Sequence, residues 1–144
     1  MNSTIAFENA LHTAGMRVTT PRRAILDFVQ SSFHHPTARQ IHDSLKKQYP
    51  TLSLATVYNT LEVLVTNGLA YDLGAAFDGE VHYDGQLSPH INLICVRCHQ
   101  IYDYPLDIFA NAATESVNAS GFKISGARIV YYGCCKSCLT NLEK

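Results

Sequence analysis

Over the first half of the chain, apolar residues recur every three or four positions, which is the spacing of one face of an α-helix. Segments with this pattern cover residues 4–14, 20–31, 37–49 and 53–66. Three of these segments open with a residue whose side chain can cap a helix N-terminus, namely Thr20, Thr37 and Ser53. The pattern therefore predicts three or four short helices.

The pattern then changes to two short runs, residues 69–73 and 80–84, which read as strands around a glycine-containing loop. Helices followed by such a hairpin are the element order of a winged helix-turn-helix. A small helical bundle with a hairpin fits the same pattern. Thr56, Tyr58 and Asn59 favour DNA binding, because hydroxyl and amide groups near a helix N-terminus can reach base edges in the major groove.

Residues 85–89, Gly-Gln-Leu-Ser-Pro, are predicted to form a hinge linker between two domains, residues 1–84 and residues 90–144. In the second domain, apolar patterns predict strands and one helix. The strands are expected at residues 91–94, 100–103, 122–124 and 127–132, and the helix at residues 106–120. The predicted fold class is α+β, with a winged helix-turn-helix followed by a small α/β domain.

Composition narrows the class of protein. The chain has 144 residues, of which 47% are hydrophobic and 16% charged, as in ordinary globular proteins. We expect a cytoplasmic protein with no membrane partner, because no apolar run approaches the roughly 20 residues that cross a bilayer and the N-terminus lacks a signal-peptide pattern. The net charge of −1 gives no basic footprint for the whole molecule, although residues 1–68 carry a small excess of basic side chains.

The five cysteines occur as Cys95-x-x-Cys98, Cys135-x-x-Cys138 and the single Cys134. In a reducing compartment this arrangement favours metal binding over disulfides. Two such pairs can supply the four corners of a tetrahedral zinc site, which would stabilise a domain too small to bury a large core. A thiol-disulfide redox pair is the alternative, but neither pair opens a helix after a buried strand.

Nitrogen and oxygen donors lie on both sides of the predicted linker. Glu80, His82 and Asp84 alternate along one predicted strand and so share a face, as do His90 and Asn92 on the next strand. Such donors suit a harder or redox-active divalent metal, so we expect two metal sites of different character. Taken singly, each histidine fits a surface or hydrogen-bonded core residue as well as a ligand.

Four segments carry a resemblance to a known family: Arg17-Val-Thr-Thr-Pro-Arg22, His35-Pro-Thr-Ala38, Ser53-Leu-Ala-Thr-Val-Tyr-Asn59 and His90-Ile-Asn-Leu-Ile-Cys95-x-x-Cys98. In this order and spacing they resemble the ferric uptake regulator family of metal-dependent repressors, over nearly the whole chain. The resemblance implies a non-enzymatic protein with a DNA-binding winged helix and a dimerisation domain. Its expected partners are double-stranded operator DNA and a second copy of the chain, and its structural Zn²⁺ is held by Cys95, Cys98, Cys135 and Cys138.

The resemblance also implies a regulatory Fe²⁺ or Mn²⁺ at the hinge. The matching ligands are His35, Asp84, His90, Asn92 and Asp103. The family often has histidine at position 92, and an amide oxygen binds these ions more weakly than imidazole. Two features resemble the peroxide-sensing branch of the family. Position 103 is aspartate, and Ser88-Pro89 stands where iron sensors have a histidine-rich run. In that branch, bound iron and peroxide oxidise a ligand, here His35 or His90, and the DNA is released.

For DNA contact, the resemblance favours Arg17, Arg22, Thr56, Tyr58 and Asn59. Tyr58 would contact thymine, Arg17 a minor groove or phosphate, and Arg22 the DNA backbone. The expected function is a metal-dependent repressor that senses peroxide. The alternatives are an iron, zinc or manganese uptake regulator of the same family, a zinc-stabilised thiol oxidoreductase that uses Cys134, Cys135 and Cys138, and a winged-helix interaction module that has lost DNA binding.

Overall fold

The protein is described by a computed structural model covering residues 2–75, 78–105, 115, 117–123 and 128–141. The chain forms two compact units, Met1–Leu87 and Ser88–Lys144. Their division lies within the segment expected to be a linker, and the finer domain boundaries given above stay predictions. In the part of the chain that is described, no helix is long and apolar enough to cross a membrane.

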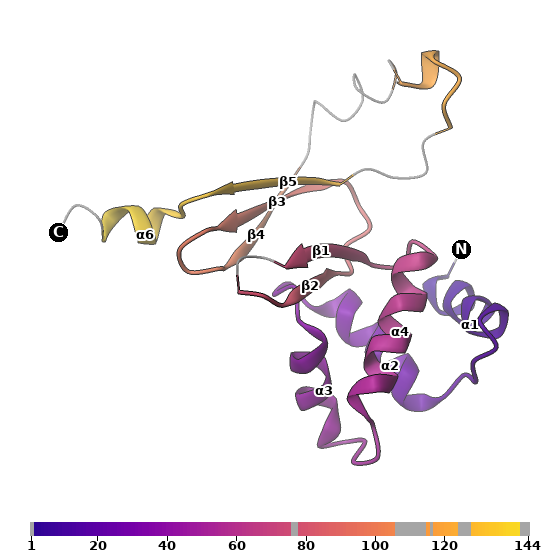
Figure 1. Cartoon of the computed structure of the whole chain (residues 1–144). Coiled ribbons are helices and arrows are strands. Elements are labelled where there is room, and N and C mark those ends of the chain that lie inside the picture. Colours follow the sequence, from indigo (N-terminus) through magenta and orange to yellow (C-terminus); the bar gives the residue numbers. More distant parts are fainter. Residues whose placement is uncertain (1, 76–77, 106–114, 116, 124–127, 142–144) are drawn as a thin grey trace. The chain divides into compact units, whose positions relative to one another are not determined.

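The first unit begins with four helices, as the periodicity predicted (Figure 1). They are α1 (Ser3–Thr13), α2 (Thr20–Ser31), α3 (Ala38–Lys46) and α4 (Leu54–Thr66). Thr37 and Ser53 cap α3 and α4 by accepting hydrogen bonds from backbone N–H groups, and Thr37 forms a full capping box. The cap of α2 is Thr19 rather than the predicted Thr20, and its side chain makes no capping hydrogen bond.

The core of the first unit is built around α4, which packs against the other three helices. Leu61 and Leu64 of α4 are fully buried, as are Phe7 and Leu11 of α1. Burying a leucine or phenylalanine side chain stabilises the fold by roughly 1.5–3 kcal/mol relative to its exposed state. The buried face of α4 therefore fixes which of its residues remain at the surface.

Strands β1 (Tyr71–Ala75) and β2 (Val81–Asp84) complete this unit as an antiparallel hairpin. Tyr71 lies opposite Asp84, and the register shifts between Asp72 and Ala75. β2 also contacts the segment before α3, since the Tyr83 N–H donates to the Pro36 carbonyl over 3.0 Å. The helices and this hairpin confirm the predicted winged helix-turn-helix order.

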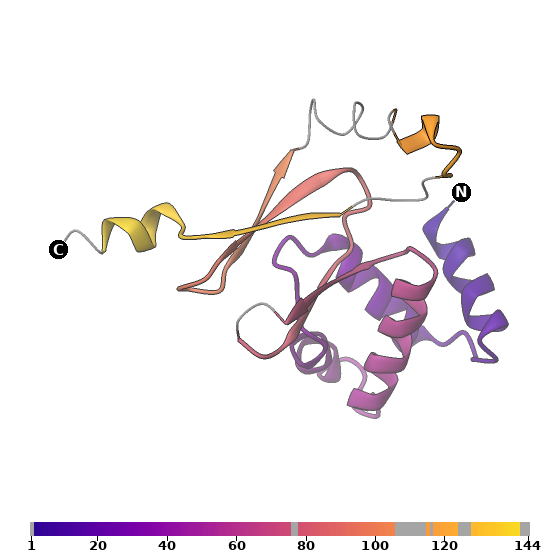
Figure 2. The ribbon, with the colours of Figure 1, turned by 45° about the horizontal axis from the view of Figure 1, so that its top comes forward.

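The second unit contains a three-stranded sheet with the order β4-β3-β5 (Figure 2). Its elements are β3 (His90–Cys95), β4 (Ile101–Pro105), β5 (Ile129–Gly133) and α6 (Lys136–Thr140). β4 is antiparallel to β3, and β5 is parallel to it. Most of the predicted helix at residues 106–120 lies outside the described residues. The strand predicted at 122–124 is wrong at Phe122 and Lys123, which are not in a strand, and residue 124 is not described.

Candidate metal centres and DNA-binding surface

The four paired cysteines come together in the second unit. Parallel pairing sets Cys95, at the end of β3, opposite Gly133, at the end of β5, so the two Cys-x-x-Cys turns follow adjacent strand ends. The four sulfur atoms of Cys95, Cys98, Cys135 and Cys138 lie within 4.8 Å of one another. The Cys98 and Cys135 sulfurs are 3.8 Å apart. Tetrahedral zinc with Zn–S bonds of about 2.3 Å places its sulfurs about 3.8 Å apart, so the cluster fits the ion.

The electrostatics of the cluster favour a bound dication. Hydrogen bonds from the backbone N–H groups of Cys98 and Cys135 lower the pKa of the Cys95 thiol to about 5. The side-chain hydrogen bond to Cys135 raises the pKa of the Cys138 thiol to about 12. The pKa values of Cys95 and Cys135 are thus lowered and those of Cys98 and Cys138 are raised, whereas a zinc ion stabilises all four sulfurs as thiolates.

Cys134 stands outside this group although it directly precedes Cys135. Its thiol is partly buried, and burial raises its pKa. Its sulfur is not among the four that lie within 4.8 Å of one another, so the geometry gives Cys134 no part in the metal cluster. This arrangement also disfavours the oxidoreductase alternative, which needs Cys134 to act with its neighbours.

A second donor group lies in the same unit, on one face of β3 and β4. His90 and Asn92 are two residues apart on β3, and Asp103 lies opposite Asn92 on β4. The Nε2 atom of His90 is 3.3 Å from the Asn92 amide nitrogen and 3.7 Å from an Asp103 carboxylate oxygen. Imidazole, amide and carboxylate donors together suit Mn²⁺ or Fe²⁺.

The tautomer of His90 fits a role as ligand. Its Nδ1 lies 2.8 Å from the Ser88 carbonyl oxygen, which can only accept a hydrogen bond. Nδ1 therefore carries the proton, and in the neutral ring Nε2 keeps a lone pair toward Asn92 and Asp103. A backbone carbonyl that fixes the ring in this way is the usual support of a metal-binding histidine.

The other two predicted regulatory ligands, His35 and Asp84, belong to the first unit. Both side chains are buried, and Asp84 accepts a hydrogen bond from the backbone N–H of Gln86 over 2.8 Å. His35 lies in the turn before α3 with φ of 48°, in the left-handed region that non-glycine residues rarely adopt. The structure thus places one part of the predicted ligand set in each unit, and a role for each as ligand stays a prediction.

His82 is a residue whose role the sequence left open, since strand alternation placed it beside Asp84 as a possible further ligand. In the structure both of its ring nitrogens face hydrogen-bond acceptors of the first unit. Nδ1 lies 2.7 Å from the His35 carbonyl oxygen, and Nε2 lies 2.7 Å from an Asp78 carboxylate oxygen. Only the hydrogen-bond geometry, which the sequence does not contain, could have revealed this.

The predicted DNA-contacting residues of α4 lie on its outer side. Tyr58 and Asn59 are exposed, and Thr56 is partly exposed, near the N-terminus of the helix. Tyr58 is 49% exposed, so about half of its surface is open to a partner. A helix N-terminus with exposed hydroxyl and amide groups is the arrangement that reads base edges in helix-turn-helix proteins.

The arginines before and within α2 have different surroundings. Arg17 is exposed, whereas the Arg22 guanidinium donates to the Arg17 carbonyl over 2.6 Å. Arg23 forms an ion pair with Glu8 of α1. Arg22 therefore stabilises the turn that presents Arg17, and its own contact with DNA stays a prediction.

Comparison with known proteins agrees with this arrangement. Residues 13–132 match the model of the ferric uptake regulator family. The chain belongs to this family. It is 35% identical over 128 residues to the peroxide operon regulator of Bacillus subtilis, a match covering 89% of this chain and 88% of that protein. It is 33% identical over 129 residues to the peroxide-responsive repressor PerR of Staphylococcus aureus, covering 90% and 86% of the two chains.

Solved structures of this family share the fold. The ferric uptake regulator of Helicobacter pylori has a TM-score of 0.75 and 19% identity, with 96% of this chain and 95% of that chain covered. The iron-containing ferric uptake regulator of Francisella tularensis has a TM-score of 0.65 and 28% identity, with 87% and 96% covered. The first match supports the fold alone, and the second also agrees with the family assignment.

Proposed function

We propose that this chain is a homodimeric, metal-dependent transcriptional repressor that binds operator DNA and responds to peroxide. The family to which it belongs consists of transcriptional regulators rather than enzymes. Our strongest support is the presence of two donor sets of different chemistry, a four-thiol cluster and a separate His-Asn-Asp group. A metal that only stabilises the fold accounts for the first set, and a regulatory metal accounts for the second.

In this proposal, Zn²⁺ bound by Cys95, Cys98, Cys135 and Cys138 is structural. The second unit has few buried apolar residues among those described, with Ile94 and Cys95 the two hydrophobic residues of β3 in its core. A zinc ion that joins the ends of β3 and β5 therefore supplies stability that packing does not. Structural zinc sites contribute about 10–16 kcal/mol of apparent binding free energy to the folding of small domains.

The regulatory metal, Fe²⁺ or Mn²⁺, would be held by His35, Asp84, His90, Asn92 and Asp103. Iron held there would supply the redox chemistry that activates hydrogen peroxide. Overall, the imidazole of His35 or His90 would take one oxygen atom from hydrogen peroxide in a two-electron oxidation of the ring, the other oxygen would leave as water, and the oxidised ring would be a poorer ligand. Since the proposed ligands come from both units, metal binding and DNA binding are linked equilibria, and loss of one weakens the other.

The DNA-binding surface would be the exposed side of α4, with Tyr58, Thr56 and Asn59 at the bases and Arg17 at a phosphate or minor groove. Arg22 would contact the DNA backbone. Each good contact to a base edge contributes about 1–3 kcal/mol of discrimination. In a dimer, two copies of α4 would read two half-sites about 34–36 Å apart.

The dimer would form through the sheet of the second unit. Leu93 of β3 lies opposite Tyr102 of β4 and Tyr131 of β5, so the three side chains form a row across one face. They are 37%, 42% and 58% exposed. His90 and Asn92 lie on the other face of β3, because side chains alternate along a strand. A second copy would therefore cover the row of Leu93, Tyr102 and Tyr131 without contacting His90 or Asn92.

The function is tested by fluorescence anisotropy with a duplex taken from the promoter upstream of its own gene. Zinc-replete protein loaded with Mn²⁺ should bind this duplex specifically, and chelation of Mn²⁺ with the zinc retained should weaken binding by at least tenfold. If the affinity for the duplex is the same with and without Mn²⁺, metal dependence is contradicted. If binding requires metal but peroxide does not change the affinity of the iron-loaded protein, the metal-uptake alternative is favoured.

A further inference from the structure

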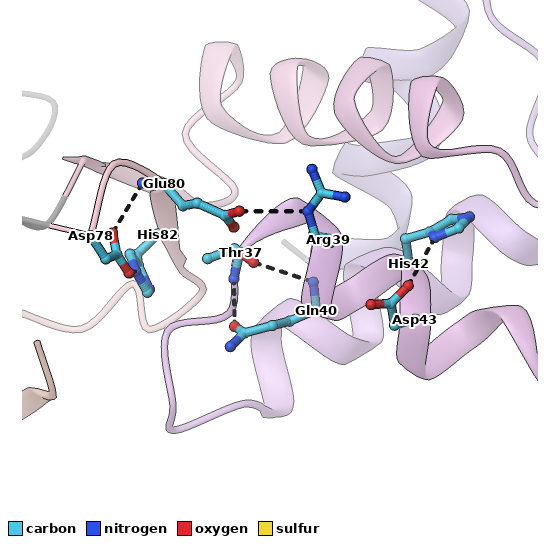
Figure 3. Close-up of polar contacts among 8 residues, drawn as sticks. All are labelled: Thr37, Arg39, Gln40, His42, Asp43, Asp78, Glu80 and His82. Atoms are coloured by element: carbon cyan, nitrogen blue, oxygen red, sulfur yellow. Dashed lines mark hydrogen bonds and ion pairs between the residues drawn. The ribbon is translucent and has the colours of Figure 1, made fainter.

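The imidazole of His82 on β2 is held at both nitrogens within the first unit. Nδ1 lies 2.7 Å from the His35 carbonyl oxygen, and Nε2 lies 2.7 Å from a carboxylate oxygen of Asp78. The His82 side chain is only 9% exposed. Figure 3 shows Asp78 and His82 together at one end of the hairpin, with Glu80 turned toward Arg39.

Both partners of His82 are acceptors. A backbone carbonyl can only accept, so Nδ1 must donate its N–H to His35, and the ionised carboxylate of Asp78 accepts from Nε2. The ring thus joins a carboxylate on one side to the main chain of His35 on the other. Both ring nitrogens are engaged by protein groups in this arrangement, so the geometry does not favour His82 as the further ligand that the sequence allowed.

The main chain that His82 holds is unusual. His35 has φ of 48°, and a left-handed conformation costs an L-residue with a side chain roughly 1–2 kcal/mol. Pro36 follows and restricts the backbone of His35 further. A turn of this kind persists only where its surroundings hold it.

Two kinds of contact tie this turn to β2. One is the His82 bond to the His35 carbonyl, and the other is the antiparallel bridge between Thr37 and His82, which includes the Tyr83 N–H bond to the Pro36 carbonyl over 3.0 Å. The bridge is made by backbone alone. The bond from His82 is the one that depends on a side chain, and it acts on the residue in the strained conformation.

We propose that His82 is the positioning residue of His35: it holds the His35 carbonyl in the left-handed turn and so fixes the direction in which the His35 imidazole leaves the backbone. This inference rests on the proposed function, in which His35 is a regulatory metal ligand. Asp78 would act indirectly, because its contact with Nε2 orients the His82 ring. Supporting groups of this kind typically change metal affinity by about 10–100-fold when they are removed.

Two substitutions separate positioning from simple packing. In His82→Asn, the side-chain amide nitrogen takes the place of Nδ1 and can still donate to the His35 carbonyl, but the contact with Asp78 is lost. In His82→Gln, the longer amide takes the place of Nε2 and can still reach Asp78, but the donor to His35 is lost. The two variants are polar and of similar size, so a role in packing alone predicts similar effects.

The readout is the Mn²⁺ dissociation constant of the full-length, zinc-replete protein, measured from the electron paramagnetic resonance signal of free Mn²⁺. His82→Gln should raise this constant by about 10–100-fold, as for loss of a supporting group, while His82→Asn should stay within about threefold of wild type. Zinc content should be unchanged in both. The matched control is Glu80→Gln on the same hairpin. It breaks the ion pair with Arg39 of α3 and should bind Mn²⁺ as wild type does.

His35→Ala distinguishes the two levels of failure. If His35→Ala binds Mn²⁺ normally, His35 is not a ligand and that part of the proposed function fails. If His35→Ala loses Mn²⁺ but the Gln and Asn variants behave alike, the positioning role of His82 is overturned while the ligand set stands. Should His82→Gln fail to fold, the Nδ1 proton of wild-type His82 must appear in slow exchange by nuclear magnetic resonance, and its absence would equally overturn the role.

Discussion

Replacing Gly85 with alanine tests how the segment that carries Asp84 is held in place. The Gly85 backbone lies against the C-terminal turn of α2 within the first unit. A Cβ atom there would be 2.4 Å from the Val29 carbonyl oxygen, 2.7 Å from the Val29 carbonyl carbon and 2.8 Å from the Gln30 Cα. All three are backbone atoms, so no side chain can rotate away, and either α2 or the segment after β2 must move.

The size of the effect follows from these distances. Ordinary van der Waals contact begins near 3.4 Å, so the two segments must separate by roughly 1 Å to reach the optimal carbon contacts of about 3.5–4.0 Å. Overpacking of this kind typically costs about 1–3 kcal/mol. In a domain of this size, each kcal/mol lowers the melting temperature by about 4–8 °C. Because Asp84 directly precedes Gly85, Mn²⁺ affinity should fall as well.

The assay is thermal unfolding of the zinc-replete protein followed by circular dichroism, together with Mn²⁺ titration. Gly133→Ala is the control, because a Cβ at Gly133 meets nothing within 4 Å and its φ is not positive. It should change stability by no more than about 0.5 kcal/mol, as for surface substitutions elsewhere. A Gly85→Ala protein that melts and binds Mn²⁺ like wild type would refute the close approach of the linker to α2.

Four further changes have defined outcomes. Cys98→Ser should lose zinc and unfold the second unit, whereas Cys134→Ser should keep one zinc per chain by elemental analysis. Asn92→His should tighten Mn²⁺ binding about tenfold, equivalent to about 1.4 kcal/mol from a better ligand. Tyr58→Ala should weaken operator binding by about 1–3 kcal/mol with unchanged Mn²⁺ affinity. Asp78→Asn should lower the free energy of unfolding near neutral pH, with the difference from wild type disappearing in acid.

The acid dependence follows from the pKa of Asp78. Burial raises this pKa, but the hydrogen bond from His82, the backbone hydrogen bonds and the charge attraction of His82 together outweigh burial and hold the pKa below the usual 3.8. Asp78 therefore contributes stability above pH 3.8, and this contribution is lost as pH falls through the lowered value. A gap between wild type and Asp78→Asn that widened in acid would contradict this sign.

The other three predictions also have outcomes that would count against them. Zinc loss from Cys134→Ser would place this thiol in the metal cluster. Unchanged Mn²⁺ affinity in Asn92→His would remove position 92 from the ligand set. If Tyr58→Ala and wild type bind the operator with equal affinity, Tyr58 does not contact DNA.

The helices of the first unit could be predicted from sequence because their signals are local. The apolar spacing is set by the helix period, and capping residues such as Thr37 and Ser53 act within three positions of themselves. The predicted end of the third helix at residue 49 was wrong, since α3 ends at Lys46 and residues 47–48 form a turn. Helix ends depend on competition between backbone hydrogen bonds, which the apolar pattern does not resolve.

The second unit shows what local patterns leave out. The Cys-x-x-Cys pairs predicted a shared zinc, but the parallel pairing of β3 with β5 that brings Cys95 beside the second pair is a contact between distant parts of the chain. Helix α6, which begins directly after Cys135, was not predicted because its five residues are too few for a periodic signal. The role of His82 stayed open for a similar reason, since alternation gives its face on β2 but not its hydrogen-bond partners.

The central claim is that iron at the proposed regulatory ligands makes this chain a peroxide sensor. The most direct test is peptide mass spectrometry of zinc-replete protein that is loaded anaerobically with Fe²⁺ and then given slightly less than one equivalent of hydrogen peroxide. We predict one added oxygen on His35 or His90, its absence when Mn²⁺ replaces Fe²⁺, and a parallel loss of operator binding. Unmodified histidines in the iron-loaded protein, or oxidation confined to cysteines, would contradict the claim.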